Sequence, residues 1–311
     1  MEAFTDIDLA LPDRRVGKVR VSYVLPDGDR LFVTTDRLSA FDRIIAGVPY
    51  KGQVLNELAA WWFRATESIV PNHVVSAPDP NVLVARAATP LPVEVIVRGY
   101  ITGVTSTSLW RRYSEGERLI YGYRFPEGLE KNTPLPTALV TPTTKADAGD
   151  HDMPLTVADV VDKGLVEAGL WKRVQEAALA VFALGQEVAA KAGLILADTK
   201  YEFGLADDGT LLLIDEMHTP DSSRFWEAAS YPDRLAAGEE PESLDKEVIR
   251  RALDDAGYRG DGTPPTLAPE VWEETTRRYI TAYERVTGRS FVPGAYPVAP
   301  RVQAAVAELG S

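Results

Sequence analysis

The spacing of apolar and polar residues predicts a β-rich start to the chain, followed by a helix. Residues 16–25 alternate in polarity, a Pro-Asp-Gly-Asp turn follows, and residues 30–36 are typical of the return strand of a hairpin. A helix is predicted over 53–68 because its apolar residues recur at helical spacing. Residues 81–101 alternate again, and 92–100 form the clearest strand pattern of the chain.

The second half alternates between helical and strand patterns. Helices are predicted over 171–192, where Gly193 is placed to cap the end, and over 271–287, which stops before a glycine. Strands are predicted over 194–206 and 211–216, on either side of an Asp-Asp-Gly-Thr turn. The order of these elements predicts an α+β fold with mixed and antiparallel sheets.

Three stretches lie outside these patterns, and the first of them is expected to be largely irregular. Residues 113–156 are rich in Pro, Thr, Gly and Asp, and a segment of that length without regular structure is usually functional or disordered. Residues 231–270 are charged and rich in Pro and Gly, which indicates a surface excursion. The tail from residue 290 is expected to be a strap that ends in a short helix.

Composition narrows the class of protein. A chain of 311 residues, 45% hydrophobic and 25% charged, is neither disordered nor fibrous, and its length suits two domains or one large domain. No apolar run approaches the roughly 18–20 residues of a membrane span, and the start does not resemble a signal or transit peptide. The absence of cysteine excludes disulfides, thiolate catalysis and Cys-bound zinc. We expect a cytoplasmic protein.

The charge balance limits the partners. Asp and Glu number 46 against 33 Lys and Arg, which gives a net charge of −13 and a surface that repels nucleic acid and anionic membranes. An anionic small substrate fits only a pocket in which the scarcer basic residues gather. With three histidines in the chain, carboxylates and lysines are expected to carry proton transfer or metal binding.

The hairpin over 196–216 is the most informative motif. If its loop is the two residues Asp208 and Gly209, Glu202 lies directly across from Asp215, and like charges placed so close destabilise a sheet. A Mg²⁺ ion would relieve that repulsion, because it accepts carboxylate oxygens and keeps other positions for water and phosphate. Strand alternation puts Asp198 and Lys200 on the Glu202 face. The alternative is a solvated edge hairpin, since a slip of one residue breaks the pairing.

Basic residues beside glycines and turns are candidate phosphate contacts. Arg98 ends an apolar strand before Gly99, where the fork of a guanidinium suits phosphate. Taken singly, each such cation is more often a solvent-facing side chain than a phosphate contact. The other candidates are Lys18 and Arg20 after Gly17, Lys145 in a Thr- and Asp-rich stretch, and Arg224 after a turn-forming run. His151 and His218 are interpreted as polar contacts, and Trp61, Trp62 and Phe63 as core.

Several of these motifs, in this order, resemble those of the SAICAR synthases (phosphoribosylaminoimidazole-succinocarboxamide synthases) of purine biosynthesis. Residues 196–204 resemble one signature of the family and 92–103 the other. The resemblance extends to about residue 290 and is closest to the longer form of yeast and plants. Its further motifs are 17–20, 36–42, Lys145 with His151 and Asp152, and 215–226.

The resemblance implies two subdomains with ATP in the cleft between them. Residues 1–90 would form a β-rich nucleotide-binding subdomain, 91–290 a larger α/β subdomain with the substrate and metal site, and 291–311 a C-terminal strap and helix. It also implies a ligase that condenses CAIR (5-amino-1-(5-phosphoribosyl)imidazole-4-carboxylate) with L-aspartate, using ATP, through an acyl phosphate. Neither nucleic acid nor membrane would be a partner, and the protein would be a monomer or a small homo-oligomer.

By the same resemblance, site residues can be assigned. Asp198 and Lys200 would be catalytic, and Glu202 and Asp215 would hold Mg²⁺. ATP would contact Lys18, Arg20, Lys200 and the backbone near Pro90 and Leu91. The substrates would contact Ser39, Asp42, Arg98, Lys145, Asp221, Ser222 and Arg224, with Asp221 at the aminoimidazole.

Two positions depart from the family pattern. Val104 follows Gly103 where the family usually has a serine that contacts the substrate phosphate, and Val21 stands where an aspartate is frequent. Val104 favours a first alternative, a paralogous ATP-dependent ligase that uses another acid or amine. A second alternative is a nucleotide-binding regulatory protein without catalysis, against which the four charges of the hairpin argue. A third is a kinase that phosphorylates a hydroxyl and needs no amine.

Overall fold

The N-terminal part of the molecule is an antiparallel sheet. The computed structural model describes residues 2–41, 43–145, 152–258, 260 and 262–309. The predicted hairpin is confirmed, since Ser22 pairs with Phe32 across two adjacent strands. The sheet has the order β1 (Arg15–Val16), β2 (Arg20–Val24), β3 (Arg30–Thr34), β7 (Val82–Ala85) and β6 (Val74–Asp79). A separate pair consists of β4 (Arg37–Ala40) and β5 (Arg43–Gly47).

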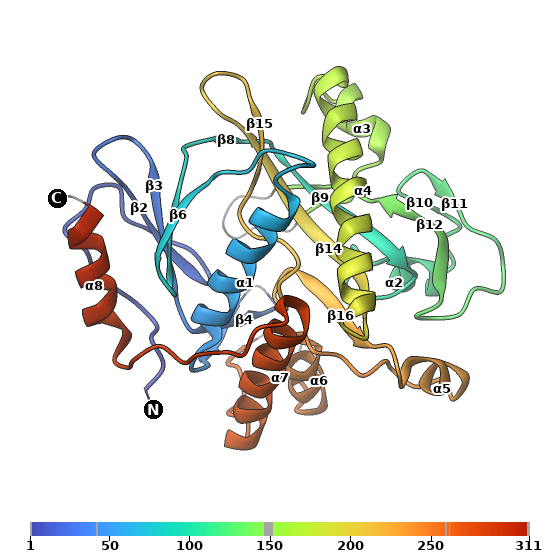
Figure 1. The fold of residues 1–311 in the computed structure, drawn as a ribbon. Coiled ribbons are helices and arrows are strands. Elements are labelled where there is room, and N and C mark those ends of the chain that lie inside the picture. Colours follow the sequence, from blue (N-terminus) through green and yellow to red (C-terminus); the bar gives the residue numbers. More distant parts are fainter. Residues whose placement is uncertain (1, 42, 146–151, 259, 261, 310–311) are drawn as a thin grey trace.

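Helix α1 (Lys51–Thr66) lies between this sheet and a second, larger one (Figure 1). It confirms the predicted helix, with both ends two residues earlier than expected. Its apolar face enters the main core, where Trp62 and Phe63 are buried as expected, and Trp61 packs against the same core. Burial of such large side chains is the main force that holds α1 in place.

The larger sheet is built around β14 (Leu194–Leu205). This strand pairs with the predicted strand β9 (Val93–Tyr100) and also with three other strands. Helix α4 (Ala168–Lys191), also predicted, packs over it, and Gly193 follows the helix with φ +69°, as a C-terminal glycine should (Figure 1). The other strands are β8 (Thr89–Pro90), β12 (Pro134–Val140), β13 (Thr143–Thr144), β15 (Leu211–Ile214) and β16 (Ser223–Glu227).

The expectation of a largely irregular segment over 113–156 is wrong in part, and the surface excursion predicted over 231–270 contains helices. The segment 113–145 contains β12 and β13 and the small pair β10 (Leu119–Ile120) and β11 (Tyr123–Arg124). The prolines of β12 concealed it, because they are tolerated on its bulged pairing with β9. The segment 231–258 contains α5 (Tyr231–Ala236) and α6 (Glu247–Asp255), which buries Ile249 and Leu253. The remaining short helices are α2 (Leu109–Ser114) and α3 (Val157–Asp162).

The C-terminal part returns to the first sheet, and the predicted strap and last helix are both present. Helix α7 (Pro269–Thr287) ends at Gly288, and a strap leads to α8 (Val298–Leu309), which packs beside β2 and β3 (Figure 1). The strap is fixed by Tyr296, whose hydroxyl donates to Asp36 Oδ2 at 2.7 Å. The division into subdomains near residue 90 stays a prediction. Among the described helices, none has the length and apolar character needed to cross a membrane.

The loop 215–222, which joins β15 to β16 and which we call the acidic loop, is anchored beneath α4. His218, in this loop, is completely buried, hydrogen-bonds to the Tyr201 hydroxyl and meets the Trp62 ring edge-on at 4.5 Å between centroids. Gly185 of α4 gives this imidazole its space, because a Cβ there would lie 2.4 Å from His218 Cε1. The anchor determines where the rest of the acidic loop can lie.

We therefore predict that Gly185→Ala destabilises the protein. Although alanine favours a helix over glycine, the added methyl group must displace both His218 and Leu196, and such overpacking costs roughly 1–3 kcal/mol. Gly169→Ala on the same helix is the control, since its Cβ would meet only the flexible side chain of Glu167. Urea unfolding measures both variants, and equal free energies of unfolding for the two would contradict the prediction.

Candidate active site

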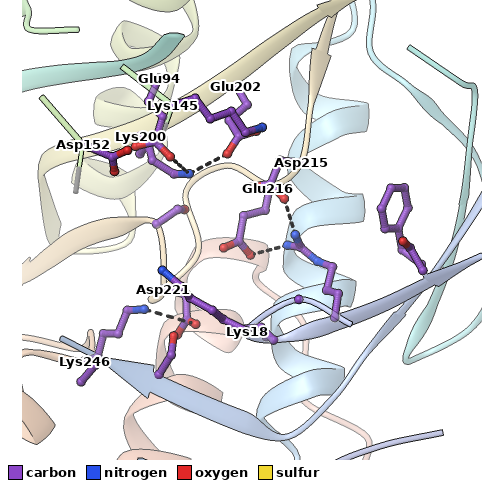
Figure 2. A pocket seen from close by; sticks show the side chains of 18 of the residues that line it. Lys18, Glu94, Lys145, Asp152, Lys200, Glu202, Asp215, Glu216, Asp221 and Lys246 are labelled. Carbon is purple, nitrogen blue, oxygen red and sulfur yellow. Dashed lines mark hydrogen bonds and ion pairs between the residues drawn. The ribbon is translucent and has the colours of Figure 1, made fainter. Parts of the chain in front are cut away.

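A cavity of about 690 Å³ lies where the first sheet, the acidic loop and β14 come together. Its lining mixes basic and acidic side chains in similar numbers (Figure 2). The basic residues of the lining are Arg15, Lys18, Arg20, Lys145, Lys200, Lys246 and Arg250, and the acidic ones are Glu94, Asp152, Glu202, Asp215, Glu216 and Asp221. A space lined in this way suits ligands that carry both phosphate and metal charge.

Lys200 on β14 is the centre of one charged group. Its Nζ lies 2.8 Å from Glu94 Oε1 and 2.7 Å from Glu202 Oε1, and Lys145 contacts the other oxygen of Glu202 (Figure 2). Burial disfavours the ammonium form, but Glu202, Glu94 and Asp215 outweigh it and hold the pKa of Lys200 well above its ordinary value. Lys200 is therefore a fixed positive charge.

The predicted register of the hairpin is wrong by one residue. Glu202 pairs with Ile214, and not with Asp215, because the loop comprises three residues instead of two. The N–H of Ala206 donates to the Thr210 carbonyl, and Gly209 occupies the left-handed region at φ +80°. Three-residue hairpin loops with a left-handed glycine are the common alternative to two-residue ones. Direct opposition of the two carboxylates is thus excluded.

Asp215 lines the cavity because the backbone turns directly after β15. It follows the last residue of β15 and has φ +67°, a left-handed conformation that ends the strand alternation. Arg20 of β2 forms ion pairs with Asp215 and, at 2.8 Å, with Glu216 (Figure 2). Burial raises the pKa of Asp215, but Arg20, Lys200 and Lys145 more than compensate and lower it. Burial also raises the pKa of Glu216, and there it prevails over Arg20.

The rest of the acidic loop is fixed by the buried His218 and by hydrogen bonds within the loop. Burial lowers the pKa of His218 to about 3, so that its imidazole is neutral at physiological pH. Ser222 lines the cavity, and its Oγ accepts the Thr219 N–H at 3.1 Å. The interpretation of His218 as a polar contact is confirmed, whereas His151 lies outside the described residues.

The structure brings most of the predicted site residues to this cavity. Those that line it are Lys18, Arg20, Ser39, Lys145, Lys200, Glu202, Asp215, Asp221 and Ser222. Asp42 lies outside the described residues. Pro90 and Leu91 are not in the lining, and the Leu91 N–H is already donated to the Phe203 carbonyl at 2.8 Å.

Asp198, Arg98 and Arg224 form a separate buried cluster. Asp198 lies opposite Arg98 on β9 and opposite Arg224 on β16, and its Oδ2 contacts both guanidinium groups, 3.4 Å from Arg98. Arg98 also donates to Thr141 Oγ1 at 2.8 Å. Burial lowers the pKa of Arg224, but Asp198, Glu247 and Asp245 raise it above its ordinary value. The expected grouping of Asp198 with Lys200 is replaced by these cross-strand ion pairs.

Sequence reasoning missed several residues of the lining. Glu94 had a signal, because it occupies a polar position of the clearest strand pattern, with Arg98 on the same face. Lys246 and Arg250 lie one helical turn apart at the start of α6, in the segment interpreted as a surface excursion. Glu216 adjoins Asp215, and only the left-handed turn between strand and loop directs it to Arg20.

The donor set fits a magnesium ion that arrives with a nucleotide. Among the described residues, no group of three or more histidine, aspartate or glutamate side chains is arranged to hold a metal. Glu202 and Asp215 instead lie with lysines and an arginine in one cavity. Mg²⁺ commonly takes one or two protein carboxylates and completes its shell with water and phosphate oxygens. Two carboxylates beside lysine and arginine side chains that could face phosphate satisfy that requirement.

The chain is closely similar to proteins of one family. A sequence model of the family described as SAICAR synthetase matches residues 14–265. A putative phosphoribosylaminoimidazole-succinocarboxamide synthase 2 of Agrobacterium fabrum is 49% identical over 283 residues, covering 91% of this chain and 90% of the relative. The phosphoribosylaminoimidazole-succinocarboxamide synthase of Legionella pneumophila (strain Lens) is 48% identical over 295 residues, covering 94% and 93%.

Solved structures agree with the sequence. A SAICAR synthase from Saccharomyces cerevisiae, complexed with SAICAR, superposes with a TM-score of 0.80 at 32% identity, covering 93% of this chain and 99% of that one. A SAICAR synthetase in complex with ADP gives a TM-score of 0.68 at 26% identity, covering 90% and 100%. The expected α+β fold is confirmed. The chain belongs to the SAICAR synthetase family, the ATP-dependent ligases that condense CAIR with L-aspartate in purine biosynthesis.

Proposed function

We propose that the cavity is the place where this chain joins CAIR to L-aspartate with ATP. The observation that carries the proposal is the pairing of Lys200 with Glu94 and Glu202, close to the pairing of Arg20 with Asp215. Three anionic substrates must meet in one space, and their charges repel unless fixed cations compensate them. A chain of net charge −13 places such cations around this cavity.

ATP would be bound by residues in and just before β2, in β14 and in the acidic loop. Lys18, Arg20 and Lys200 would bind the phosphates of ATP. The adenine would meet the backbone near Pro90 and Leu91, outside the cavity lining, where the Leu91 N–H is already donated to Phe203. Glu202 and Asp215 would hold Mg²⁺ beside those phosphates. When bound, the ion supplies Lewis acidity and neutralises phosphate charge. The ADP bound by a structural relative supports the ATP assignment.

The other substrates would be bound by residues around the acidic loop and in the separate arginine cluster. Ser39, Lys145, Asp221 and Ser222 would contact CAIR or aspartate, as would Arg98 and Arg224. Asp42 keeps its proposed substrate contact from the sequence analysis, since it lies outside the described residues. Asp198, expected to be catalytic, is ion-paired with both arginines, and we propose that it acts by fixing their orientation.

The chemistry follows from the difficulty of making an amide from a carboxylate. ATP transfers its γ-phosphoryl group to a carboxylate oxygen of CAIR, which gives an acyl phosphate and ADP. The amine of L-aspartate attacks the acyl carbon, loses a proton, and expels phosphate as the amide forms. The chain's own work is to align the three substrates and to hold their negative charges with Lys200, Arg20 and Lys145.

One observation favours a second candidate, a ligase of the same chemistry that acts on another acid or amine. Val104 is 49% exposed beside a small cavity lined by Lys131 and Arg224, where a hydroxyl group would serve a substrate phosphate. The hydroxyl groups of Thr105 and Ser108, which follow it, hydrogen-bond to each other at 2.7 Å. Val104 thus contributes no polar contact of its own at this place.

Location and assembly remain proposals of the sequence analysis. We keep the cytoplasm as the proposed compartment and a monomer or small homo-oligomer as the proposed assembly. Compartments differ among relatives, since one from Arabidopsis thaliana, 47% identical over 94% of this chain, is named chloroplastic. Fractionation of the source cells and light scattering of the purified protein test the two proposals.

Release of ADP from Mg-ATP and CAIR, with and without L-aspartate, tests the proposed function. We expect ADP release that depends on aspartate, with a product whose mass is that of SAICAR. Absence of turnover with CAIR, alongside tight binding of Mg-ATP, would contradict the proposal and support another acid. Release of one ADP per substrate without any amine would indicate a kinase.

We predict that Lys200→Met lowers kcat by roughly 10²–10³-fold, the size of effect seen when one stabilising donor is removed from an active site. The variant removes the fixed charge between Glu94 and Glu202 and leaves these two carboxylates facing each other. Lys172→Met is the control, because Lys172 is an exposed residue of α4 away from the cavity. Steady-state kinetics measure both, and a kcat within about threefold of wild type for Lys200→Met would refute the assignment.

We predict that Glu202→Gln and Asp215→Asn each raise the Mg²⁺ concentration needed for half-maximal rate by at least roughly tenfold, since each removes one anionic ligand. Asp208→Asn, at the tip of the same hairpin and outside the cavity, is the control. Titration of Mg²⁺ at saturating ATP measures the effect. An unchanged Mg²⁺ requirement in both site variants would mean that these carboxylates do not hold the ion.

A further inference from the structure

A tyrosine from the C-terminal helix contacts the acidic loop. Tyr279 lies on α7, beyond the residues 14–265 that match the family, and it is 1% exposed. Its hydroxyl donates to Asp221 Oδ1 at 2.6 Å. Asp221 lines the cavity (Figure 2). The contact with Tyr279 therefore links a helix distant in sequence to the wall of the proposed active site.

Two lysines hold the other oxygen of the same carboxylate. Lys51, at the start of α1 and completely buried, places its Nζ 2.9 Å from Asp221 Oδ2, and Lys246 places its Nζ 3.4 Å from the same atom. Burial raises the pKa of Asp221, but Lys246, Lys51 and the Tyr279 hydroxyl outweigh it and keep that pKa well below its ordinary value. Asp221 is therefore an ionised group with a fixed orientation.

The donors leave Asp221 with limited accepting capacity. An ionised carboxylate has about four lone-pair sites, two on each oxygen. Lys51 donates to Oδ2, Lys246 lies within ion-pair distance of the same oxygen, and Tyr279 occupies one site of Oδ1. Only 3% of the Asp221 side chain is exposed. One acceptor site of Oδ1 therefore remains for a ligand in the cavity.

We propose that Tyr279 is a positioning residue that orients Asp221, so that the remaining lone pair of Oδ1 accepts one N–H of the exocyclic amino group of the carboxylate substrate. The inference rests on the proposed function and adds a determinant of specificity to it. A substrate without that amino group leaves the acceptor unpaired in a buried place, which is a strong basis for rejection.

The burial of this cluster agrees with a positioning role. Taking the charges of Lys51 and Asp221 out of water carries a desolvation penalty that their attraction only partly repays, so a buried ion pair of this kind contributes little to stability. The effect of this ion pair is to fix the orientation of the Asp221 carboxylate. Tyr279 adds a directional hydrogen bond at Oδ1, on the oxygen that the lysines do not hold.

Tyr279→Phe tests the inference, because it removes only the hydroxyl group. Tyr283→Phe is the matched control, one turn further along α7 and outside the cavity lining. We expect Tyr279→Phe to raise the KM for CAIR by about tenfold while the KM for ATP stays within about twofold, which corresponds to the loss of one hydrogen bond to a charged group. A uniform rise in every KM, or no rise at all, would overturn the proposal.

A substrate analogue supplies a second readout that a merely structural role would not move. The ribotide that carries hydrogen in place of the exocyclic amino group is tested as a competitive inhibitor of CAIR turnover. Wild type should bind it at least about tenfold more weakly than CAIR, and Tyr279→Phe should reduce that ratio. Equal binding of analogue and CAIR by wild type, or an unchanged ratio in the variant, would overturn the inference. Wild type without CAIR turnover would instead overturn the proposed function.

Discussion

The architecture of the site depends on ion pairs that hold the carboxylates of the acidic loop from outside the loop. Asp215 is held by Arg20 of the first sheet, and Asp221 by Lys51 of α1 and Lys246 beside α6. Buried carboxylates without such partners would be strongly unfavourable, so the loop adopts its functional shape only where these elements meet. The cavity is therefore a product of the whole fold.

The same pairing explains how an acidic protein can bind anionic substrates. In the cavity the carboxylates keep each cation charged and in place, as the raised pKa of Lys200 illustrates. Phosphate groups and a metal ion can then occupy a space in which both kinds of partner are already fixed, which reduces the reorganisation needed during reaction. Amide formation from an unreactive carboxylate benefits from such fixed charges, because phosphoryl transfer depends mainly on alignment and neutralisation.

The sequence predicted the local elements well, and it predicted long-range geometry less well. The helices α1, α4 and α7 and the strands β9 and β14 follow from periodicity, and the motifs indicated the family. The predicted pairing of Glu202 with Asp215 was wrong because a three-residue loop shifts the register by one residue. Both carboxylates still line the same cavity, because Asp215 has a left-handed backbone conformation. Lys51 and Tyr279 carried no local signal, since their contacts to Asp221 span 170 and 58 residues.

The most direct test of the account follows an oxygen atom. CAIR labelled with ¹⁸O in both carboxylate oxygens is converted with ATP and L-aspartate, and the phosphate and the amide product are analysed by mass spectrometry. If ATP activates the carboxylate in this cavity, each phosphate released carries one ¹⁸O and each amide retains the other. Phosphate without ¹⁸O would contradict the account, because the carboxylate oxygen would then have left by a route that does not involve phosphorylation.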